Sequence, residues 1–115
     1  MDIDDLAAQI RDFATDRDWE QFHTLRSLIL SLQTELGELA EIVQWTPDSK
    51  MTHEWIDLHF DELSEEVADV FIYLVRLADV AGIDLMKAAE RKIEANGVKY
   101  PVEKARGNAT KYTRL

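Results

Sequence analysis

Two pairs of acidic residues stand one helical turn apart within strongly apolar stretches of the chain. Glu35 and Glu38 form the first pair, and Glu66 and Asp69 form the second. Residues three apart share one face of an α-helix, so each pair presents two carboxylates in the same direction. If the two pairs face each other, charge repulsion and desolvation are costly unless a divalent cation or a basic residue neutralises them. Carboxylate oxygens suit Mg²⁺, so the spacing predicts a magnesium site.

The second pair belongs to a longer polar stripe. Glu62, Glu66, Asp69, Tyr73 and Arg76 follow a spacing of 4, 3, 4 and 3 residues, which places them along one side of a helix. Either acidic pair, taken alone, is explained by a helix face that points toward solvent. The combination favours a metal site, because apolar residues surround the second pair and leave little room for a purely solvent-exposed helix.

Aromatic and basic residues form a second set of candidates for binding. Trp19 and His23 precede the second expected helix, Trp45 ends it, and Tyr73 lies on the polar stripe. A nucleobase can stack on such side chains, although most aromatic residues in a small domain belong to a core or an interface. The C-terminal part could hold phosphates or be a solvated helix end; its candidate residues are Lys92, Asn96, Lys99 and Tyr100.

Several other chemistries find no support in the sequence. A di-iron carboxylate bundle needs two Glu-x-x-His motifs, and only Glu20 with His23 fits that pattern. The sequence contains no His-Glu-x-x-His, no Gly-Lys-Ser/Thr phosphate loop and no Gly-x-Ser-x-Gly. With no cysteine, it also has no disulfide, thiolate metal site or cysteine nucleophile.

The elements that position these residues are all expected to be helices. Apolar stripes predict helices over 3–14 and 25–43, the second capped by Thr24. A third runs from about Thr52 to Gly82 and is apolar nearly all round after Val67, which is typical of a buried central helix. A fourth begins after Asp84, has Leu85, Ala88, Ala89 and Ile93 inward, and ends at Gly97 with Pro101. We expect an all-α four-helix bundle followed by a basic, poorly patterned tail.

Length and charge predict the number of domains, the oligomeric state, the partners and the location of the protein. The 115 residues suit a single domain, residues 1–115, and so short a chain favours a homodimer or homotetramer. The net charge of −10 argues against a nucleic-acid polymer as partner. Residues 1–86 hold 5 basic and 20 acidic residues, whereas residues 87–115 hold 8 basic and 3 acidic ones. An acidic N-terminus, the absence of cysteine and the lack of a membrane-length apolar run predict a cytoplasmic protein with no membrane contact.

The chain resembles the MazG-like all-α nucleotide pyrophosphohydrolases, and within them the dCTP pyrophosphatase group. The two acidic pairs lie in "GELAEIVQW" and "EEVADVFIYLVRLA", and the segments "RDWEQFH", "KIEANGVKYP" and "KYT" are also similar to that group. One position departs from it, since Ile10 stands where related sequences can carry a histidine on the first helix.

The resemblance implies an activity and a role for each candidate. Glu35, Glu38, Glu66 and Asp69 would bind Mg²⁺, with Mn²⁺ as a possible substitute, and Glu38 would align or deprotonate the water that attacks the α-phosphorus. The substrate would be a deoxynucleoside triphosphate, dCTP or a modified dCTP, and pyrophosphate would leave. Base and sugar would bind at Trp19, His23, Trp45 and Tyr73, with the phosphates near Lys92, Asn96, Lys99 and Tyr100.

Two other hypotheses remain open at this stage. An acidic helical bundle without catalytic activity could serve as a protein-interaction module, although it leaves the polar stripe unexplained. A broad-specificity housecleaning dNTPase would share the metal site but not a preference for one base.

Overall fold

The computed structural model describes all 115 residues, and its regular elements are helices without any strand. The all-α fold class is therefore confirmed. Residues 1–82 and residues 83–115 form two compact units. No helix in the structure combines the length and the apolar character needed to cross a bilayer.

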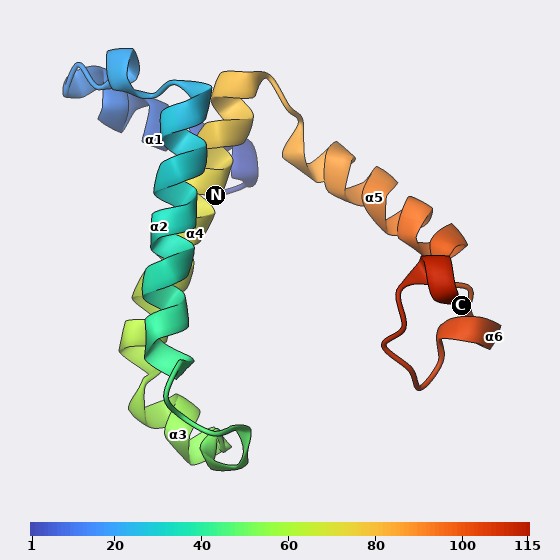
Figure 1. Cartoon of the computed structure of the whole chain (residues 1–115). Coiled ribbons are helices and arrows are strands. Elements are labelled where there is room, and N and C mark those ends of the chain that lie inside the picture. The colour runs from blue at the N-terminus through green and yellow to red at the C-terminus, as the bar shows by residue number, and fades with distance from the viewer. The chain divides into compact units, whose positions relative to one another are not determined.

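The first unit is built around two long helices that run side by side (Figure 1). Helix α2 (Leu25–Val43) packs along α4 (Phe60–Ala81), and α1 (Ile3–Asp16) packs against α4 as well. Short helical segments fill the connections: η1 (Glu20–Phe22), η2 (Asp48–Lys50) and α3 (His53–Leu58). The pairing of α2 with α4 is what brings the two acidic segments of the sequence together.

Side-chain hydrogen bonds cap the N-terminal ends of α1 and α2, and the cap at Thr24 is as predicted. Asp2 and Asp5 form a reciprocal capping box at α1, and the Thr24 hydroxyl accepts a hydrogen bond from the Ser27 amide at the start of α2. Each cap satisfies a backbone N–H that the helix leaves without a partner. Gly82 ends α4 at its C-terminus with a φ of 70°, a left-handed conformation that glycine adopts without a steric penalty.

The expected single helix from Thr52 to Gly82 is interrupted, and in this respect the prediction is wrong. His59 has φ −106° and ψ 11°, outside helical geometry, and separates α3 from α4. Its ring Nδ1 lies 2.8 Å from the Trp55 carbonyl oxygen, and the ring stacks on the Trp55 indole at 4.1 Å. The histidine side chain thus adds a second contact to the Trp55 carbonyl, which also accepts a hydrogen bond from the His59 backbone N–H.

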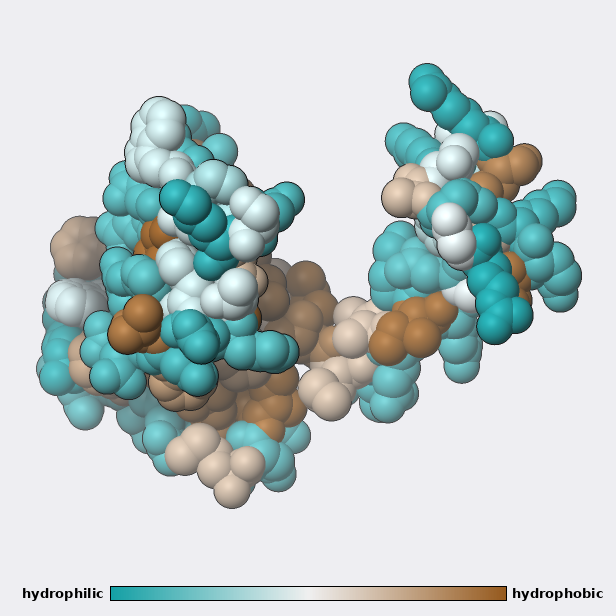
Figure 2. All heavy atoms as spheres, turned by 90° about the horizontal axis from the view of Figure 1, so that it is seen from below, coloured by the Kyte–Doolittle hydropathy of each residue, from teal (hydrophilic) through white to brown (hydrophobic).

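Few side chains of the first unit are fully buried within one chain. The buried apolar residues are Ala14, Leu28, Val75 and Ala78. Helix α4 was expected to be a buried central helix, yet Val67 and Phe71 are 53% and 43% exposed. Figure 2 shows such hydrophobic side chains, in brown, at the surface among hydrophilic ones. Within a single chain the expectation is therefore only partly met, because part of the apolar surface of α4 has nothing packed over it.

The second unit begins with α5 (Leu85–Lys99), which Asp84 caps by accepting a hydrogen bond from the Lys87 amide. The cap is as predicted, but the helix continues past Gly97 to Lys99, and Ile93 is 72% exposed rather than inward. The C-terminal residues are not wholly irregular either. They contain α6 (Val102–Ala105) after Pro101, whose fixed φ suits the start of a helix, and η3 (Tyr112–Arg114).

Candidate functional site

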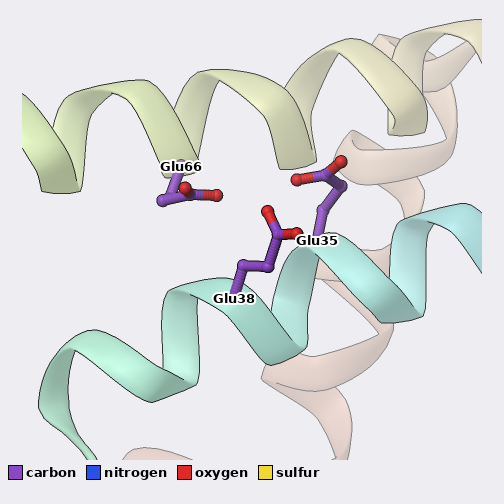
Figure 3. A group of neighbouring side chains, drawn as sticks. All are labelled: Glu35, Glu38 and Glu66. Carbon is purple, nitrogen blue, oxygen red and sulfur yellow. The ribbon is translucent and has the colours of Figure 1, made fainter.

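Three of the four predicted carboxylates converge between α2 and α4. Glu35 and Glu38 project from α2 and Glu66 projects from α4 into the same space (Figure 3). Each offers a carboxylate oxygen, and these oxygens all lie within 4.8 Å of one another. Three oxygens this close can share one cation, which is the arrangement that the spacing in the sequence predicts.

The electrostatics of this cluster are unfavourable without a counter-charge. Glu35 Oε2 and Glu66 Oε2 are buried and have no hydrogen-bond partner. Desolvation and the neighbouring Glu38 raise the pKa of both carboxyls, and Asp69 adds to the rise. Buried acceptors without donors are rare in folded proteins. These two oxygens therefore fit a site that a divalent cation completes.

Asp69 lies on α4 one turn beyond Glu66, and its side chain is exposed. It stands outside the group of three, but it is close enough for its charge to raise the pKa of Glu35 and of Glu66. It forms no ion pair, since Arg76 pairs with Asp79 instead. Asp69 is thus positioned beside the cluster without a cation of the protein to neutralise it.

A cavity of about 380 Å³ lies beside the N-terminal half of α2. Three of the predicted base-pocket residues line it, namely Trp19, His23 and Tyr73, together with Phe22, Ser27, Leu28 and Ser31. The rings of Trp19 and His23 meet edge to face, with centroids 6.5 Å apart. The cavity thus combines aromatic faces with hydroxyl and imidazole groups, a lining that suits a small aromatic ligand with polar edges.

Ile10 lines a smaller cavity of about 100 Å³ that also touches Trp19, His23 and Tyr73. Its other walls are Phe13, Ile72 and Arg76. The isoleucine therefore gives an apolar surface to the region beside the larger cavity.

Trp45 does not join the other aromatic residues. It follows the C-terminal end of α2 and is 86% exposed, whereas the cavity lies at the other end of that helix. Ser31 is the cavity residue of α2 nearest to Trp45 in the sequence, and a rise of 1.5 Å per residue places the two about 20 Å apart along the helix. Within one chain, Trp45 and Trp19 therefore cannot contact the same base.

The predicted phosphate residues all lie in the second unit. Lys92, Asn96 and Lys99 recur at four and three residues along α5, so they share one face of that helix. The Lys99 ammonium lies 4.9 Å from the centre of the Tyr112 ring, and Tyr100 meets Tyr112 edge to face at 5.9 Å. Tyr112 thus orders the end of α5, a contact that the sequence alone did not indicate.

A buried arginine lies behind the cavity, and its partners from other parts of the chain were not indicated by the sequence. Arg76 is only 6% exposed and donates hydrogen bonds to His23 and to Asp79. Asp79 in turn accepts two hydrogen bonds from Arg11 of α1. The position of Arg76 on the polar stripe hinted at a role, but 53 residues separate it from His23, and 68 separate Arg11 from Asp79. Only the packed structure shows these pairs.

Comparison with known proteins agrees with this geometry. The chain is 44% identical to dCTP pyrophosphatase 1 of Bos taurus over 98% of its own length and 68% of that protein's. It is 42% identical to dCTP pyrophosphatase 1 of Homo sapiens, over 98% of this chain and 67% of the human one.

A solved structure provides an independent comparison. The crystal structure of a pyrophosphatase from Archaeoglobus fulgidus matches 85% of this chain and 91% of its own, with a TM-score of 0.81 and 42% sequence identity. The sequence model of the MazG-like family matches residues 30–115, which include both acidic pairs. The chain belongs to the MazG-like family.

Proposed function

We propose that this protein hydrolyses a deoxynucleoside triphosphate, with dCTP as the preferred substrate, to the monophosphate and pyrophosphate. The observation that carries the proposal is the group of three carboxylates between α2 and α4, two of which bury an oxygen without a partner. Relatives named dCTP pyrophosphatase match nearly the whole chain, and they support both the reaction and the base.

The cation is proposed to be Mg²⁺, with Mn²⁺ as a substitute. Glu35, Glu38 and Glu66 would hold it, and Asp69 would complete the set from the next turn of α4. A divalent ion bound there supplies charge neutralisation for the triphosphate and lowers the pKa of water. The carboxylates are hard ligands without any histidine or cysteine among them, which favours Mg²⁺ over zinc.

The residues around the cluster are assigned by their chemistry. The cavity of Trp19, His23 and Tyr73 would take the base and sugar, with the indole and imidazole rings offering faces to stack on. Glu38, which is exposed, would align or deprotonate the attacking water. Lys92, Asn96 and Lys99 of α5, with Tyr100 directly after this helix, would contact the phosphates. Residues 1–115 are proposed to act as one functional domain.

A homodimer or homotetramer is part of the proposal. The exposed apolar side chains of α2 and α4, among them Ile29, Leu36 and Phe71, are each more than 40% exposed in one chain, and a second copy would cover them. Because Trp45 lies about 20 Å along α2 from the cavity of its own chain, a neighbouring subunit would supply Trp45 to the base pocket. A nucleotide-pool enzyme of this kind is expected in the cytoplasm.

Product analysis over a panel of nucleoside triphosphates tests the reaction. We expect monophosphate and pyrophosphate in equal amounts, dependence on Mg²⁺ or Mn²⁺, and the highest kcat/KM for dCTP. Orthophosphate as the product, or full activity in EDTA, would contradict the proposed reaction. Equal kcat/KM values over the panel would instead indicate a broad-specificity dNTPase.

Mixing two variants tests the shared pocket. Trp19→Ala and Trp45→Ala are each expected to weaken substrate binding by about 1 to 3 kcal/mol if the tryptophan stacks on the base. If one pocket takes its two tryptophans from two subunits, exchange between the variants creates some pockets with both, and activity at low dCTP rises above that of either variant alone. A mixture that never exceeds the average of its components would refute the shared pocket.

A further inference from the structure

His23 is bound to the protein through only one of its two ring nitrogens. The Nε–H of Arg76 donates a hydrogen bond to His23 Nδ1 at 3.0 Å. An arginine side chain has donors only, so the nitrogen that it contacts has to be an acceptor and carries no proton. A neutral imidazole with Nδ1 unprotonated has its proton on Nε2.

Arg76 is itself held in place by two further charged residues. Its Nη1 donates to Asp79 Oδ2 at 3.1 Å, and Arg11 donates to both oxygens of Asp79 at 2.9 and 2.7 Å. The bidentate pair fixes the carboxylate, and the carboxylate fixes the plane of the guanidinium. Because Arg76 is only 6% exposed, water cannot readily take the place of these contacts.

The surroundings of His23 oppose a second proton. Burial lowers the pKa of His23, the positive charge of Arg76 lowers it further, and Glu20 of η1 opposes both effects. On the helices packed around His23, the other charged or titratable groups are the Tyr73 phenol, Asp79 and Arg11. Asp79 and Arg11 lie on the far side of Arg76. A proton on His23 Nδ1 would also place two hydrogen-bond donors, the Nδ1–H and the Arg76 Nε–H, opposite each other with no acceptor between them.

The second nitrogen is the one that remains available to a ligand. His23 lines the 380 Å³ cavity with Trp19, Tyr73, Ser27 and Ser31, and no atom of the chain forms a hydrogen bond with its Nε2. The serine hydroxyls can rotate and either donate or accept. The imidazole cannot adapt in this way while Arg76 occupies Nδ1.

We infer that Arg76 acts as a positioning residue that locks His23 as the Nε2–H tautomer, so that the cavity presents a fixed hydrogen-bond donor to the edge of the base. The inference rests on the proposed function, because the ligand is taken to be a pyrimidine nucleotide. N3 of cytosine is an acceptor and can receive this hydrogen bond, whereas N3 of thymine carries a proton and meets the donor with another donor. The locked tautomer thus selects cytosine over thymine.

Nitrogen NMR tests the tautomer without any change to the chain. In protein labelled with ¹⁵N on histidine, we expect the His23 signals of an unprotonated Nδ1 and a protonated Nε2 at neutral pH. In Arg76→Met, we expect a mixture of tautomers and a higher His23 pKa, since the charge and the donor are both lost. Arg26→Met is the matched control, because Arg26 is exposed and forms no hydrogen bond or ion pair within the chain. A protonated Nδ1 in the wild type would overturn the inference.

Kinetics test the selection. In Arg76→Met, the ratio of kcat/KM for dCTP to that for dTTP is expected to fall about tenfold, the equivalent of one hydrogen bond, mainly through KM for dCTP. Asp79 keeps both hydrogen bonds from Arg11 in this variant, and a thermal melt checks that the fold is retained. An unchanged ratio in a folded variant refutes the inference.

The two proposals fail in different ways. If the wild type hydrolyses no nucleoside triphosphate, the proposed function fails, and titration of His23 with dCMP and dTMP followed by NMR still tests the donor. Preferential binding of dCMP that Arg76→Met abolishes would then support the inference, and equal binding of both nucleotides would refute it.

Discussion

Asp69 carries a charge that no basic residue of the protein neutralises, although it lies beside three other carboxylates. Asp69→Asn keeps the shape of the side chain and removes one of these charges. We therefore expect the metal-free variant to be as stable as the wild type or more stable. If Asp69 is a metal ligand, the variant also loses pyrophosphate release and most of the stabilisation by Mg²⁺. Thermal melts with and without Mg²⁺, together with an assay of pyrophosphate release, measure each effect.

Asp61→Asn is the control for this experiment, because Asp61 is exposed on the same helix and forms no ion pair. It should keep both activity and Mg²⁺-induced stabilisation. A less stable Asp69→Asn protein that retains its activity would contradict the assignment of Asp69 to the metal site.

Asp79 shows the opposite electrostatic behaviour. The two hydrogen bonds from Arg11 lower its pKa, against the opposing effect of burial. A carboxyl whose pKa is lowered in the folded state stabilises the fold at any pH above its ordinary pKa, which is 3.8 for aspartate. This stabilisation is lost as the pH falls through the folded-state pKa. Asp79→Asn leaves the buried Arg76 without its carboxylate, so we expect it to cost about 3 kcal/mol at neutral pH.

Urea denaturation over a range of pH checks this prediction. The difference in free energy of unfolding between wild type and Asp79→Asn should narrow as the solution is acidified below pH 4. A difference that stays constant with pH would mean that the charge of Asp79 contributes nothing and that only the packing of its side chain matters.

At the scale of helices, two glycines should respond to alanine in opposite ways. Gly82 ends α4 with a φ of 70°, so Gly82→Ala forces a left-handed residue with a Cβ and should destabilise the fold by about 1 kcal/mol. Gly37 lies inside α2, and a methyl group there would meet no packed neighbour within 4 Å, so Gly37→Ala should stabilise the helix by about 0.5 to 1 kcal/mol. Equilibrium unfolding of the metal-free variants measures both values, and a shift of the same sign in both would contradict the explanation.

The helices were largely predictable because their boundaries depend on neighbours in the sequence. Asp2, Thr24 and Asp84 cap backbone amides three residues away, and Gly82 ends α4 by its own conformation. The break at His59 was not predictable from apolar spacing. It arises from the stacking of His59 on Trp55 and from a ring hydrogen bond, in a segment without glycine or proline.

The candidate site was predictable to the extent that it follows helical spacing. Glu35 and Glu38 share a face by their spacing, and the pairing of two long helices brings Glu66 opposite them. Arg76 and Asp79 lie three residues apart on α4, but the rest of the network behind His23 could not be predicted, because Arg11 reaches Asp79 only through the packing of α1 on α4. The position of Trp45 was not predictable either, because its place in the sequence did not show that α2 holds it away from Trp19, His23 and Tyr73.

For the whole molecule, assembly is the main expectation. Residues 1–86 carry a net charge of −15 and residues 87–115 carry +5, so opposite charges as well as apolar faces can attract separate copies. Light scattering should give the mass of a dimer or tetramer, and the melting temperature should rise with protein concentration. A monomer whose mass and melting temperature are independent of concentration would refute assembly.

The small number of buried side chains also bears on mutational tolerance. Only four apolar residues of one chain are buried, while Ile29, Leu36 and Phe71 are 48%, 48% and 43% exposed. If partner subunits cover such residues, a saturation mutagenesis screen would reject polar substitutions at Ile29, Leu36 and Phe71 as strongly as at Leu28. Selection would then act on these positions as it acts on a protein interior, and sequence drift would be confined to sites such as Arg26, which has no partner in the chain and is exposed.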